Sequence, residues 1–556
     1  MPNLYLSLLR QYSDTLLEHQ FVNDNPEFFG GMFCDSCKVI HGRCIDAIYG
    51  LVVAYKEFKD EKYLLGAKRL LGYSHNLICK DGGIYNDLQT TWRYTTTFFV
   101  IDIAETLFAA KDILPNDFVK DLENHLSIHA KWLYEKLDEN SPTNINYPIN
   151  NCLALFLAGT YLKEEKYLKQ SKHLANYALE HISENNLLFG EGRPHNKVTP
   201  NGCLAIDLGY NLEESLPALV KYAFYSKNKE MLDTLYKVAK AHLDFILPDG
   251  AIDNSFGSRN YKWTYYGSRT CDGIFPLALI YGERDSRFLE AARRNLLLLK
   301  KCSPNGLLSG GPDYAKHNEK ACLHHTFEHI NAIAFGVVNF SDEYLSSKGD
   351  NLPSDGSYEK YYKEFASYRL ANKNYLMDIS CYDENIPYNG HASGATATML
   401  FSRKEGPIIM GSVGNYCLTE ATNMQVPLDT ESHRPLLPRF EIIKNGKLFS
   451  SAYFLRQKKV EGSAFKFISG LGSKDGEELE DISFTYEYLF SDSGLTIKIS
   501  NFPMQIPFIL PLINGELSVE KGEITSESSI FFLTPGFLAK EFKIQLIEGE
   551  AIIHIK

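Results

Sequence analysis

Residues 46–71 read Asp46-Ala-Ile-Tyr-Gly-Leu-Val-Val-Ala-Tyr-Lys-Glu-Phe-Lys-Asp-Glu-Lys-Tyr-Leu-Leu-Gly-Ala-Lys-Arg-Leu-Leu71, and this stretch decides the fold of most of the chain. Apolar residues dominate its first half, a charged turn follows, and apolar residues recur every three or four positions in its second half. This pattern predicts an apolar helix, a tight turn and an amphipathic helix. A helical hairpin of this kind cannot bury its apolar face alone and must pack against neighbouring hairpins.

The same unit recurs along the first two-thirds of the sequence. Clear copies begin near Leu153, Glu214 and Phe275, and less regular ones lie around 95–137 and 322–340. The copies are unevenly spaced, which is not typical of a thin solenoid. About six hairpins with inserts of variable length predict a closed helical ring, an α/α toroid of the (α/α)6 type.

The sequence pattern changes beyond about residue 375. Alternation of apolar and polar residues appears, for example at 484–490, and Asn445-Gly446 is a hairpin turn signal. Short strands with regular turns indicate an antiparallel β-sandwich. We therefore predict a multidomain chain, α then β, with the toroid at 1–375 and the sandwich at 376–556.

Composition limits the possible functions. The 556 residues exceed one ordinary core, and the net charge of −12 argues against a general nucleic-acid binder. No run of about 18 apolar residues exists that could span a membrane. The eleven scattered cysteines suit a reduced interior, and the first residues lack the pattern of a secretion signal. We expect a cytoplasmic protein, or a periplasmic one if an export signal has been removed.

Polar and glycine-rich turns follow the second helix of several hairpins. They lie at 81–85, 188–193, 249–253 and 304–314. Equivalent turns of a closed repeat lie on the same rim, so we expect their side chains to meet at one central mouth.

The stretch 249–273 is the densest of these polar segments. It mixes three acids with Arg259, Lys262 and Arg269, and it also carries Trp263 and the pair Tyr265-Tyr266. Aromatic faces suit sugar rings, cations suit an acidic group, and tyrosine can transfer protons. The alternative is a well hydrogen-bonded surface loop.

The segment Asp249-Gly-x4-Ser255-x9-Tyr265-Tyr266-Gly267 resembles the tyrosine loop of toroid polysaccharide lyases, namely the hyaluronate/chondroitin, alginate and heparinase II/III group. The layout of toroid followed by sandwich resembles the same group. The resemblance implies β-elimination at a uronic acid, with Tyr265 or Tyr266 as base and acid.

The resemblance also suggests partners for the tyrosine. It implies that an asparagine at a helix start, here Asn150 or Asn151, neutralises the uronate, although Cys152 stands where several relatives have histidine. It implies that His195 pairs with the tyrosine. The three cations of 249–273 could lower the tyrosine pKa by stabilising the phenolate. A helix cap is the alternative role for the asparagines.

Other polar and aromatic residues near the predicted mouth are candidates for substrate binding. With the catalytic candidates Arg269, Glu191 and Asp253, they complete the predicted site: Trp92, Arg93, Asn150, Arg193, Tyr210, Asn211, Glu214, Arg259, Lys262, Trp263, Asp272, His324 and His325.

Two groups contain metal-ligand residue types. Cys34, Cys37, His41 and Cys44 follow one another closely, but structural zinc sites usually have a longer spacer between ligand pairs. His325 and His329 are four residues apart without the zinc-protease pattern. Small apolar cysteines near a helix start explain the first group at least as well, and we predict neither metal nor cofactor.

Two other functions compete with elimination. A glycoside hydrolase of glucuronidase type needs two carboxylates, for which Glu191, Glu214, Asp253 and Asp272 are candidates. A non-catalytic glycan-binding protein needs only aromatic platforms. For the lyase we expect a uronic-acid-containing oligosaccharide as substrate, exo-action, no nucleic-acid or membrane partner, and a possible homodimer.

Overall fold

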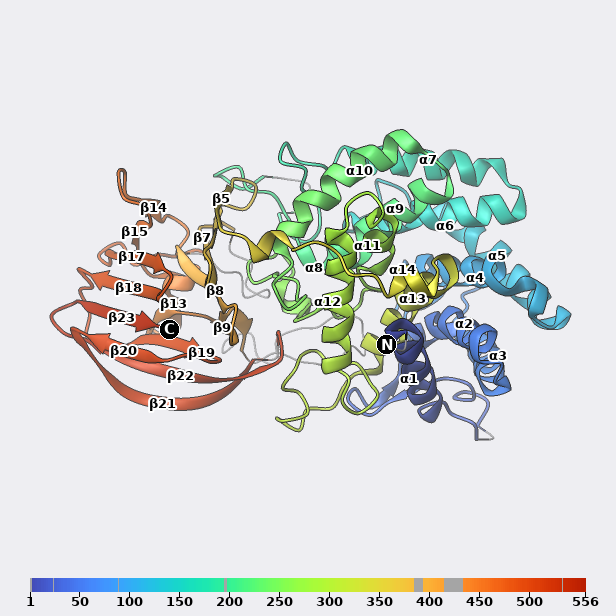
Figure 1. Ribbon diagram of the computed structural model, residues 1–556, viewed down its shortest axis with the longest axis horizontal. Helices are drawn as coiled ribbons and strands as arrows, with labels where there is room; N and C mark the ends of the chain where they lie inside the picture. The colour runs from blue at the N-terminus through green and yellow to red at the C-terminus, as the bar shows by residue number, and fades with distance from the viewer. Residues whose placement is uncertain are drawn as a thin grey trace.

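The computed structural model of the protein describes residues 3–23, 25–88, 90–194, 198–384, 394–414, 434–532 and 534–556. Figure 1 shows two parts, a helical part that begins at the N-terminus and a part made of β-sheets that holds the C-terminus. None of the described helices is long and apolar enough to cross a membrane.

The helical part is a closed ring. Each inner helix packs against the next, and the last of them packs against the first: α2 (Ile48–Phe58), α4 (Thr96–Ala110), α6 (Asn146–Leu162), α9 (Leu216–Tyr225), α11 (Phe275–Tyr281) and α13 (Leu323–Asn339). Each has an outer partner: α3 (Glu61–Ser74), α5 (Asn116–Lys136), α7 (Glu165–Leu179), α10 (Lys229–His242), α12 (Arg287–Lys301) and, for α13, α1 (Leu4–Glu18). The predicted (α/α)6 toroid is confirmed.

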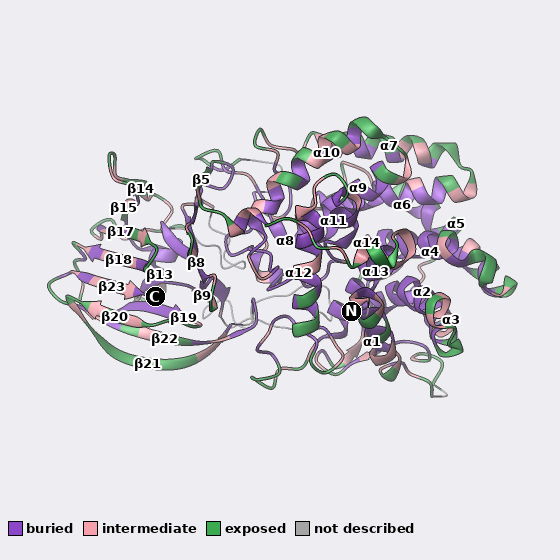
Figure 2. Cartoon of the chain, in the orientation of Figure 1, coloured by how far each residue is buried: buried purple, intermediate pink, exposed green. Residues whose placement is uncertain are grey.

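The two rings differ in burial because their sequences differ. Inner helices α4, α6 and α13 are buried on almost every side, whereas outer helices bury one stripe and expose the other, as Figure 2 shows. A helix that is apolar all round belongs inside a core, and an amphipathic one covers it. Each fully buried leucine or phenylalanine contributes about 1.5–3 kcal/mol relative to the exposed side chain.

Three hairpins turn in the same way. Lys59, Lys163 and Lys227 follow an inner helix and have φ of 56°, 61° and 55°, in the left-handed region. A left-handed residue after a helix satisfies its last carbonyls and reverses the chain. Asp60 and Asn228 then cap the next helix by accepting hydrogen bonds from the backbone N–H groups of Lys62 and Met231.

The predicted rim turns are equivalent in space as well as in sequence. Three of them are closed by the same kind of backbone bridge, Ile78 with Ile84, Ile182 with Leu188 and Ile246 with Ile252. The shared bridge puts the polar residues that follow each turn at the same end of the ring, as expected for one mouth.

The C-terminal part consists of antiparallel sheets. A five-stranded sheet has the order β5 (Tyr358–Tyr362), β6 (Ser367–Ala371), β7 (Tyr375–Ser380), β8 (Thr396–Ser402), β9 (Gly406–Met410). Two six-stranded sheets follow. One has the order β16 (Gly472–Ser473), β13 (Lys447–Ser450), β12 (Arg439–Lys444), β19 (Phe508–Leu512), β22 (Phe537–Leu546), β21 (Gly522–Phe532). The other has the order β14 (Lys458–Lys459), β15 (Lys466–Ser469), β17 (Phe484–Ser491), β18 (Gly494–Ser500), β23 (Ala551–Ile555), β20 (Leu517–Glu520).

Side chains of all three large sheets meet in one apolar core, to which β7, β17, β18 and β23 all contribute. The hairpin signal is confirmed, since Asn445 and Gly446 connect β12 to β13 with φ of 52° and 76°.

Short elements complete the fold. Three two-stranded pairs are β1 (Phe33–Cys34) with β2 (Val39–Ile40), β3 (Trp263–Thr264) with β4 (Gly267–Ser268), and β10 (Ser412–Val413) with β11 (Pro435–Leu436). Short helices are α8 (Leu208–Tyr210) and α14 (Asp342–Leu345).

Strands begin earlier than the predicted change at residue 375. β5 and β6 precede that residue and belong to the same sheet as β7. β5 contains three tyrosines and two charged residues, and only Tyr362 is buried, so the strand shows no alternation of apolar and polar residues.

The sheet part sits against the rim of the toroid. Arg369 of β6 forms ion pairs of 2.6 Å with Asp253 of a rim turn and with Asp378 of β7. Ser255 donates a hydrogen bond to Thr398 of β8. The polar rim therefore faces the sheets.

Candidate functional site

Five residues from two rim segments and the starts of two inner helices form one network, which we call the Tyr210 cluster; four of them are buried and Arg259 is half-buried. Its members are Asn146, Glu191, Tyr210, Glu214 and Arg259. Four of them are among the predicted site residues, and Asn146 lies beside the predicted Asn150 and Asn151.

Tyr210 begins the inner helix of the fourth ring position. Asp207 caps it by accepting the Tyr210 backbone N–H at 3.0 Å, and one π-helical turn (Asn211–Ser215) follows before α9. The Tyr210 hydroxyl lies 2.6 Å from the Thr270 hydroxyl. π-Helical turns are rare and are often found at functional sites.

Arg259 joins Tyr210 to Glu191. Its guanidinium carbon lies 4.1 Å from the Tyr210 ring centroid, and its backbone N–H donates to Asp207 at 2.7 Å. The same guanidinium forms an ion pair with Glu191. Burial raises the pKa of Tyr210 well above its usual value, and the Arg259 charge opposes that rise.

Glu191 is completely buried. Its Oε1 accepts a hydrogen bond from Asn144 at 3.0 Å as well as from Arg259, whereas Oε2 has no hydrogen-bond partner among the described residues. Burial raises the pKa of this carboxyl, and Arg259 opposes the rise. An unsatisfied buried acceptor is costly, so it is expected at a site that binds something else.

Glu214 lies at the end of the π-helical turn, opposite the start of α6. Asn146 donates to its Oε1 at 2.6 Å, and the Cys271 thiol donates to its Oε2 at 3.2 Å. Burial raises the pKa of Glu214 to about 7, with Glu191 adding to the rise and Asn146 opposing it. Glu214 therefore changes charge near neutral pH, and Asn146 Oδ1 has no partner within the described chain.

A buried cation, Arg43, lies next to the cluster and was not singled out from the sequence. It pairs with Asp46 at 2.8 Å and with Glu328 at 2.9 Å, and one of its nitrogens lies 3.4 Å from His324 Nε2. Its charge also acts on Glu214. The available signal was its position between His41 and Cys44, at the start of the first inner helix.

Aromatic side chains border the cluster. Trp92 donates a hydrogen bond of 2.9 Å to the Tyr147 hydroxyl, and their rings meet edge to face at 5.6 Å. Trp92 is half-buried, so part of its indole is open to solvent. Trp92 is one of the predicted substrate-binding candidates, and Tyr147 lies directly against it.

Tyr265 and Tyr266 lie apart from this network. Tyr265 donates to Asp249 at 2.7 Å and packs against Phe537 of β22, while the Tyr266 hydroxyl lies 2.7 Å from His325 Nδ1. Both are fully buried, and burial raises both pKa values well above that of free tyrosine. The Arg269 charge opposes the rise in the pKa of Tyr266 without cancelling it, as Arg259 does for Tyr210.

Several other predicted residues have structural partners. Asp253 pairs with Arg369, and Asn151 donates to the Leu137 carbonyl at 2.7 Å. Asn150, Asn211, Trp263 and Arg269 likewise bond within the fold, to the Asn146, Leu188 and Ile252 carbonyls and the Tyr314 hydroxyl respectively. These partners range from the preceding helical turn, for Asn150, to a strand 116 residues away, for Asp253, and the sequence pattern did not reveal them.

The remaining predicted residues lie around the cluster or outside it. Asp272 lines a small central cavity with Asn150 and Glu214, and Lys262 is buried near His324. Arg93 forms a surface pair with Asp81. Arg193 is exposed on the rim, and His195 lies outside the described residues.

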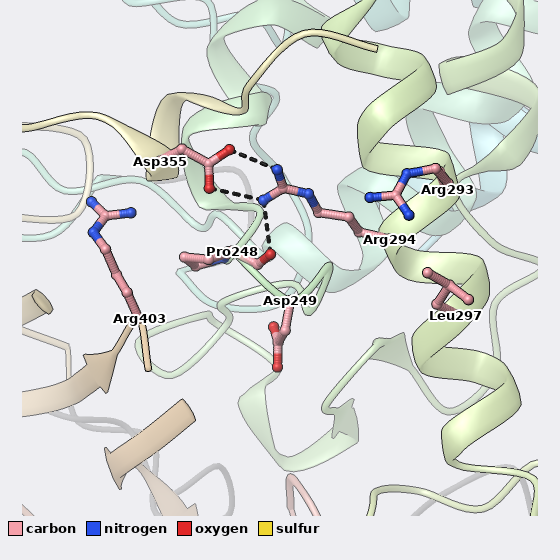
Figure 3. A pocket seen from close by; sticks show the side chains of 7 residues that line it. All are labelled: Pro248, Asp249, Arg293, Arg294, Leu297, Asp355 and Arg403. Atoms are coloured by element: carbon pink, nitrogen blue, oxygen red, sulfur yellow. Dashed lines mark hydrogen bonds and ion pairs between the residues drawn. The ribbon is translucent and has the colours of Figure 1, made fainter. Parts of the chain in front are cut away.

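A larger pocket of about 550 Å³ lies on the outer side of the ring, and Figure 3 shows its lining. Arg294 forms two hydrogen bonds of 2.8 Å with Asp355 and another with the Pro248 carbonyl. Arg403 donates to the carbonyls of Ser354 and Gly356. None of the Tyr210 cluster lines this pocket.

Comparisons with known proteins agree with this architecture. Residues 9–354 match the family model of the ulvan lyase N-terminal domain, and residues 359–536 match that of the ulvan lyase C-terminal domain. The chain is 31% identical over 562 residues to a broad-specificity ulvan lyase of Formosa agariphila, a match that covers 96% of this chain and 86% of that protein.

One similar solved structure supports the same fold, and a second is more distant. A chondroitin AC lyase of Streptomyces coelicolor is 10% identical with a TM-score of 0.54, covering 99% of this chain and 79% of that one. A heparan sulfate lyase of Pedobacter heparinus is 11% identical with a TM-score of 0.44, covering 99% and 83%. The resemblance to toroid polysaccharide lyases is confirmed.

Proposed function

Because this chain belongs to the ulvan lyase family, we propose that it cleaves ulvan by β-elimination at a uronic acid, with Tyr210 as the proton-transfer residue. The family makes the chain a polysaccharide lyase, and the similar Formosa agariphila protein is named for its action on ulvan. The assignment of individual residues rests on the geometry of the Tyr210 cluster.

The reaction needs two kinds of group. It breaks the C5–H and C4–O4 bonds of the uronate and forms a C4–C5 double bond, and the proton removed from C5 balances the one gained by O4. The C5 proton is weakly acidic until the adjacent carboxylate is neutralised. A site must therefore hold the carboxylate with donors and place one proton-transfer group beside C5 and O4.

Asn146 and Glu214 are the carboxylate-binding pair in this proposal. The Asn146 amide is an N–H donor at a helix start, and Glu214 with a pKa of about 7 is protonated in a large fraction of molecules near neutral pH. An approaching uronate raises that fraction further, because like charges disfavour each other. Glu214 then donates its proton in a hydrogen bond, while Arg43 adds positive charge.

Tyr210 is the proton-transfer group, and the position of Arg259 is the observation that carries this assignment. A guanidinium 4.1 Å from the ring centroid stabilises the phenolate more than the phenol. Tyr210 can thus accept the C5 proton and return it to O4 on the same face of the sugar. Trp92 and Tyr147 supply the aromatic surface against which a neighbouring ring would pack.

The decisive experiment compares Tyr210→Phe with two matched losses of a buried tyrosine hydroxyl. Product is followed through the ultraviolet absorbance of the unsaturated uronate released from ulvan. We expect Tyr210→Phe to lower kcat by about 10²–10⁴-fold, as for loss of a general acid–base group. Tyr266→Phe and the remote Tyr281→Phe, whose hydroxyl donates to the Leu232 carbonyl at 2.9 Å, should keep kcat within a few-fold of the parent value.

Two results would count against the assignment. If Tyr266→Phe abolishes product and Tyr210→Phe does not, the tyrosine loop identified by resemblance holds the proton-transfer group. If sugar is released without the absorbance of a double bond, cleavage is hydrolytic, and Glu191 and Glu214 become the carboxylate pair.

The mode of attack is a separate part of the proposal. We infer exo-action on uronic-acid-containing oligosaccharides. Small products should then appear from the first minutes while long chains keep their length. An early ladder of intermediate sizes would instead show cleavage within the chain.

A further inference from the structure

Three thiols and one imidazole meet in the core behind the Tyr210 cluster. Cys34, Cys37, His41 and Cys322 are all buried, and one donor atom from each lies within 4.8 Å of the others. The first three come from one short segment around the β1–β2 pair. Cys322 comes from the residue immediately before α13, on the other side of the point where the ring closes.

The three distances from Cys322 Sγ to the other donor atoms match the edges of a tetrahedral site. Cys34 Sγ and Cys37 Sγ lie 3.8 and 3.4 Å from Cys322 Sγ, and His41 Nε2 lies 3.5 Å from it. With Zn–S near 2.3 Å and Zn–N near 2.0 Å, the edges of a tetrahedral site are about 3.8 Å between sulfurs and about 3.5 Å between sulfur and nitrogen. Sulfurs of a disulfide would be about 2.05 Å apart, and all three cysteines are free thiols.

Backbone features around the cluster favour bound thiolates. The Cys37 N–H lies 3.4 Å from Cys34 Sγ and donates to it, as expected for a second-shell hydrogen bond to a metal ligand. Cys322 stands at the N-cap of α13, a helix of 17 residues whose N-terminal dipole stabilises negative charge. Lys38 has φ of 60°, so the chain reverses sharply between the two cysteines and His41.

We propose that Cys34, Cys37, His41 and Cys322 bind one structural Zn²⁺ ion. Three thiolates and an imidazole are the ligands of structural zinc sites, and four protein ligands leave no open position for substrate or water. Cys44, which the sequence grouped with the other three, is not part of the set. Structural zinc sites usually have a long spacer between their ligand pairs. Here that spacer spans most of the toroid, since Cys322, the fourth ligand, lies 281 residues after His41.

The ion would fix two residues beside the active site. Arg43 and His324 each lie two positions from a ligand, and their side chains approach to 3.4 Å. Arg43 also bonds Glu328 on the same helix, so the metal and this ion pair join the first segment of the ring to the last. Loss of the metal should therefore loosen the ring closure and shift Arg43.

The test is metal analysis of the full-length protein purified without a polyhistidine tag. By inductively coupled plasma mass spectrometry we expect one zinc ion per chain in the parent protein. The Cys37→Ser and Cys322→Ser variants should contain less than a tenth of this amount of zinc. Cys44→Ser is the matched control, since it removes a neighbouring buried thiol and should retain the zinc. Protein produced with Co²⁺ should show the visible bands of tetrahedral cobalt and a thiolate-to-cobalt charge-transfer band.

The cobalt spectrum keeps the test independent of variants that fail to fold. His41→Cys serves as a second check, because it preserves four ligands and should retain the metal. Metal far below one per chain in the parent protein, an octahedral cobalt spectrum, or zinc retained by folded Cys322→Ser would overturn the proposal. A different tetrahedral metal in the parent protein would overturn the choice of zinc.

Discussion

Individual side chains in this protein take their roles from their surroundings more than from their type. Tyr210, Tyr265 and Tyr266 are all buried tyrosines near a polar rim. Only Tyr210 lies under a guanidinium, whereas Tyr265 binds Asp249 and Tyr266 lies beside His325. The same principle applies to the carboxylates, since Asp253 is neutralised by Arg369 while Glu214 has a pKa of about 7.

Glu214 gives a pH dependence whose direction follows from its raised pKa. In the proposal, protonated Glu214 binds the uronate. Protonated Glu214 predominates below pH 7 and is lost as the pH rises through about 7. We expect kcat/KM of the parent enzyme to carry a falling limb there. Glu214→Gln mimics the protonated acid, so it should remain active and lack that limb.

Measurement of kcat/KM for both proteins between about pH 5 and pH 9 checks this expectation, because that range extends to both sides of the Glu214 pKa of about 7. An inactive Glu214→Gln would point to an essential carboxylate, and an unchanged limb in the variant would assign the titration to another group.

The repeated hairpin is the unit from which the toroid is built, and its turn carries a measurable strain. A non-glycine residue in the left-handed region costs about 1 kcal/mol relative to glycine. Lys163→Gly, at φ 61° between α6 and α7, should therefore raise the free energy of unfolding by up to about 1 kcal/mol with kcat unchanged.

The matched control is Lys172→Gly on the exposed face of α7, where glycine should lower stability by about 1 kcal/mol. Chemical denaturation of both variants gives the sign. If the two substitutions act in the same direction, the turn conformation does not carry the energy ascribed to it.

Helices and turns were also the most predictable features of this chain. The periodicity of the helical hairpins correctly predicted the toroid, because inner and outer helices differ in composition. Asn445-Gly446 correctly predicted a β-hairpin, because few residue types adopt the left-handed backbone conformation. β5 was missed because only one of its five residues, Tyr362, is buried, so no apolar alternation marks the strand. Contacts between residues far apart in the sequence could not be predicted. The residues around Asp253 do not indicate its ion pair with Arg369, which lies 116 residues away, and those around Cys37 do not indicate its contact with Cys322.

Across the chain as a whole, the toroid and the sheets are joined by a buried ion triad. Arg369 forms ion pairs with Asp253 of the rim and with Asp378 of β7. All three side chains are buried. Removing one partner of a buried ion pair leaves uncompensated charge and costs about 3–5 kcal/mol. We expect Arg369→Met to lower the unfolding temperature strongly.

Neutralising the whole triad tests the cause. The variant Asp253→Asn/Arg369→Met/Asp378→Asn should recover most of the lost stability, because no buried charge remains. Differential scanning calorimetry compares the three proteins. A triple variant as unstable as Arg369→Met would show that the loss reflects packing between the toroid and the sheets, not electrostatics.

The pairing of α1 with α13 has a consequence for how the chain is made. On a ribosome, the first helix leaves the exit tunnel long before its partner exists, since Glu18 and Leu323 are separated by almost the entire ring. At about 5–20 residues per second, translation of that interval takes roughly 15–60 s. During this time α1 can pack against α2 and α3, but the part of its apolar face that α13 covers has no native partner. We therefore expect a chaperone that binds apolar segments of nascent chains to be needed for the longest time at α1.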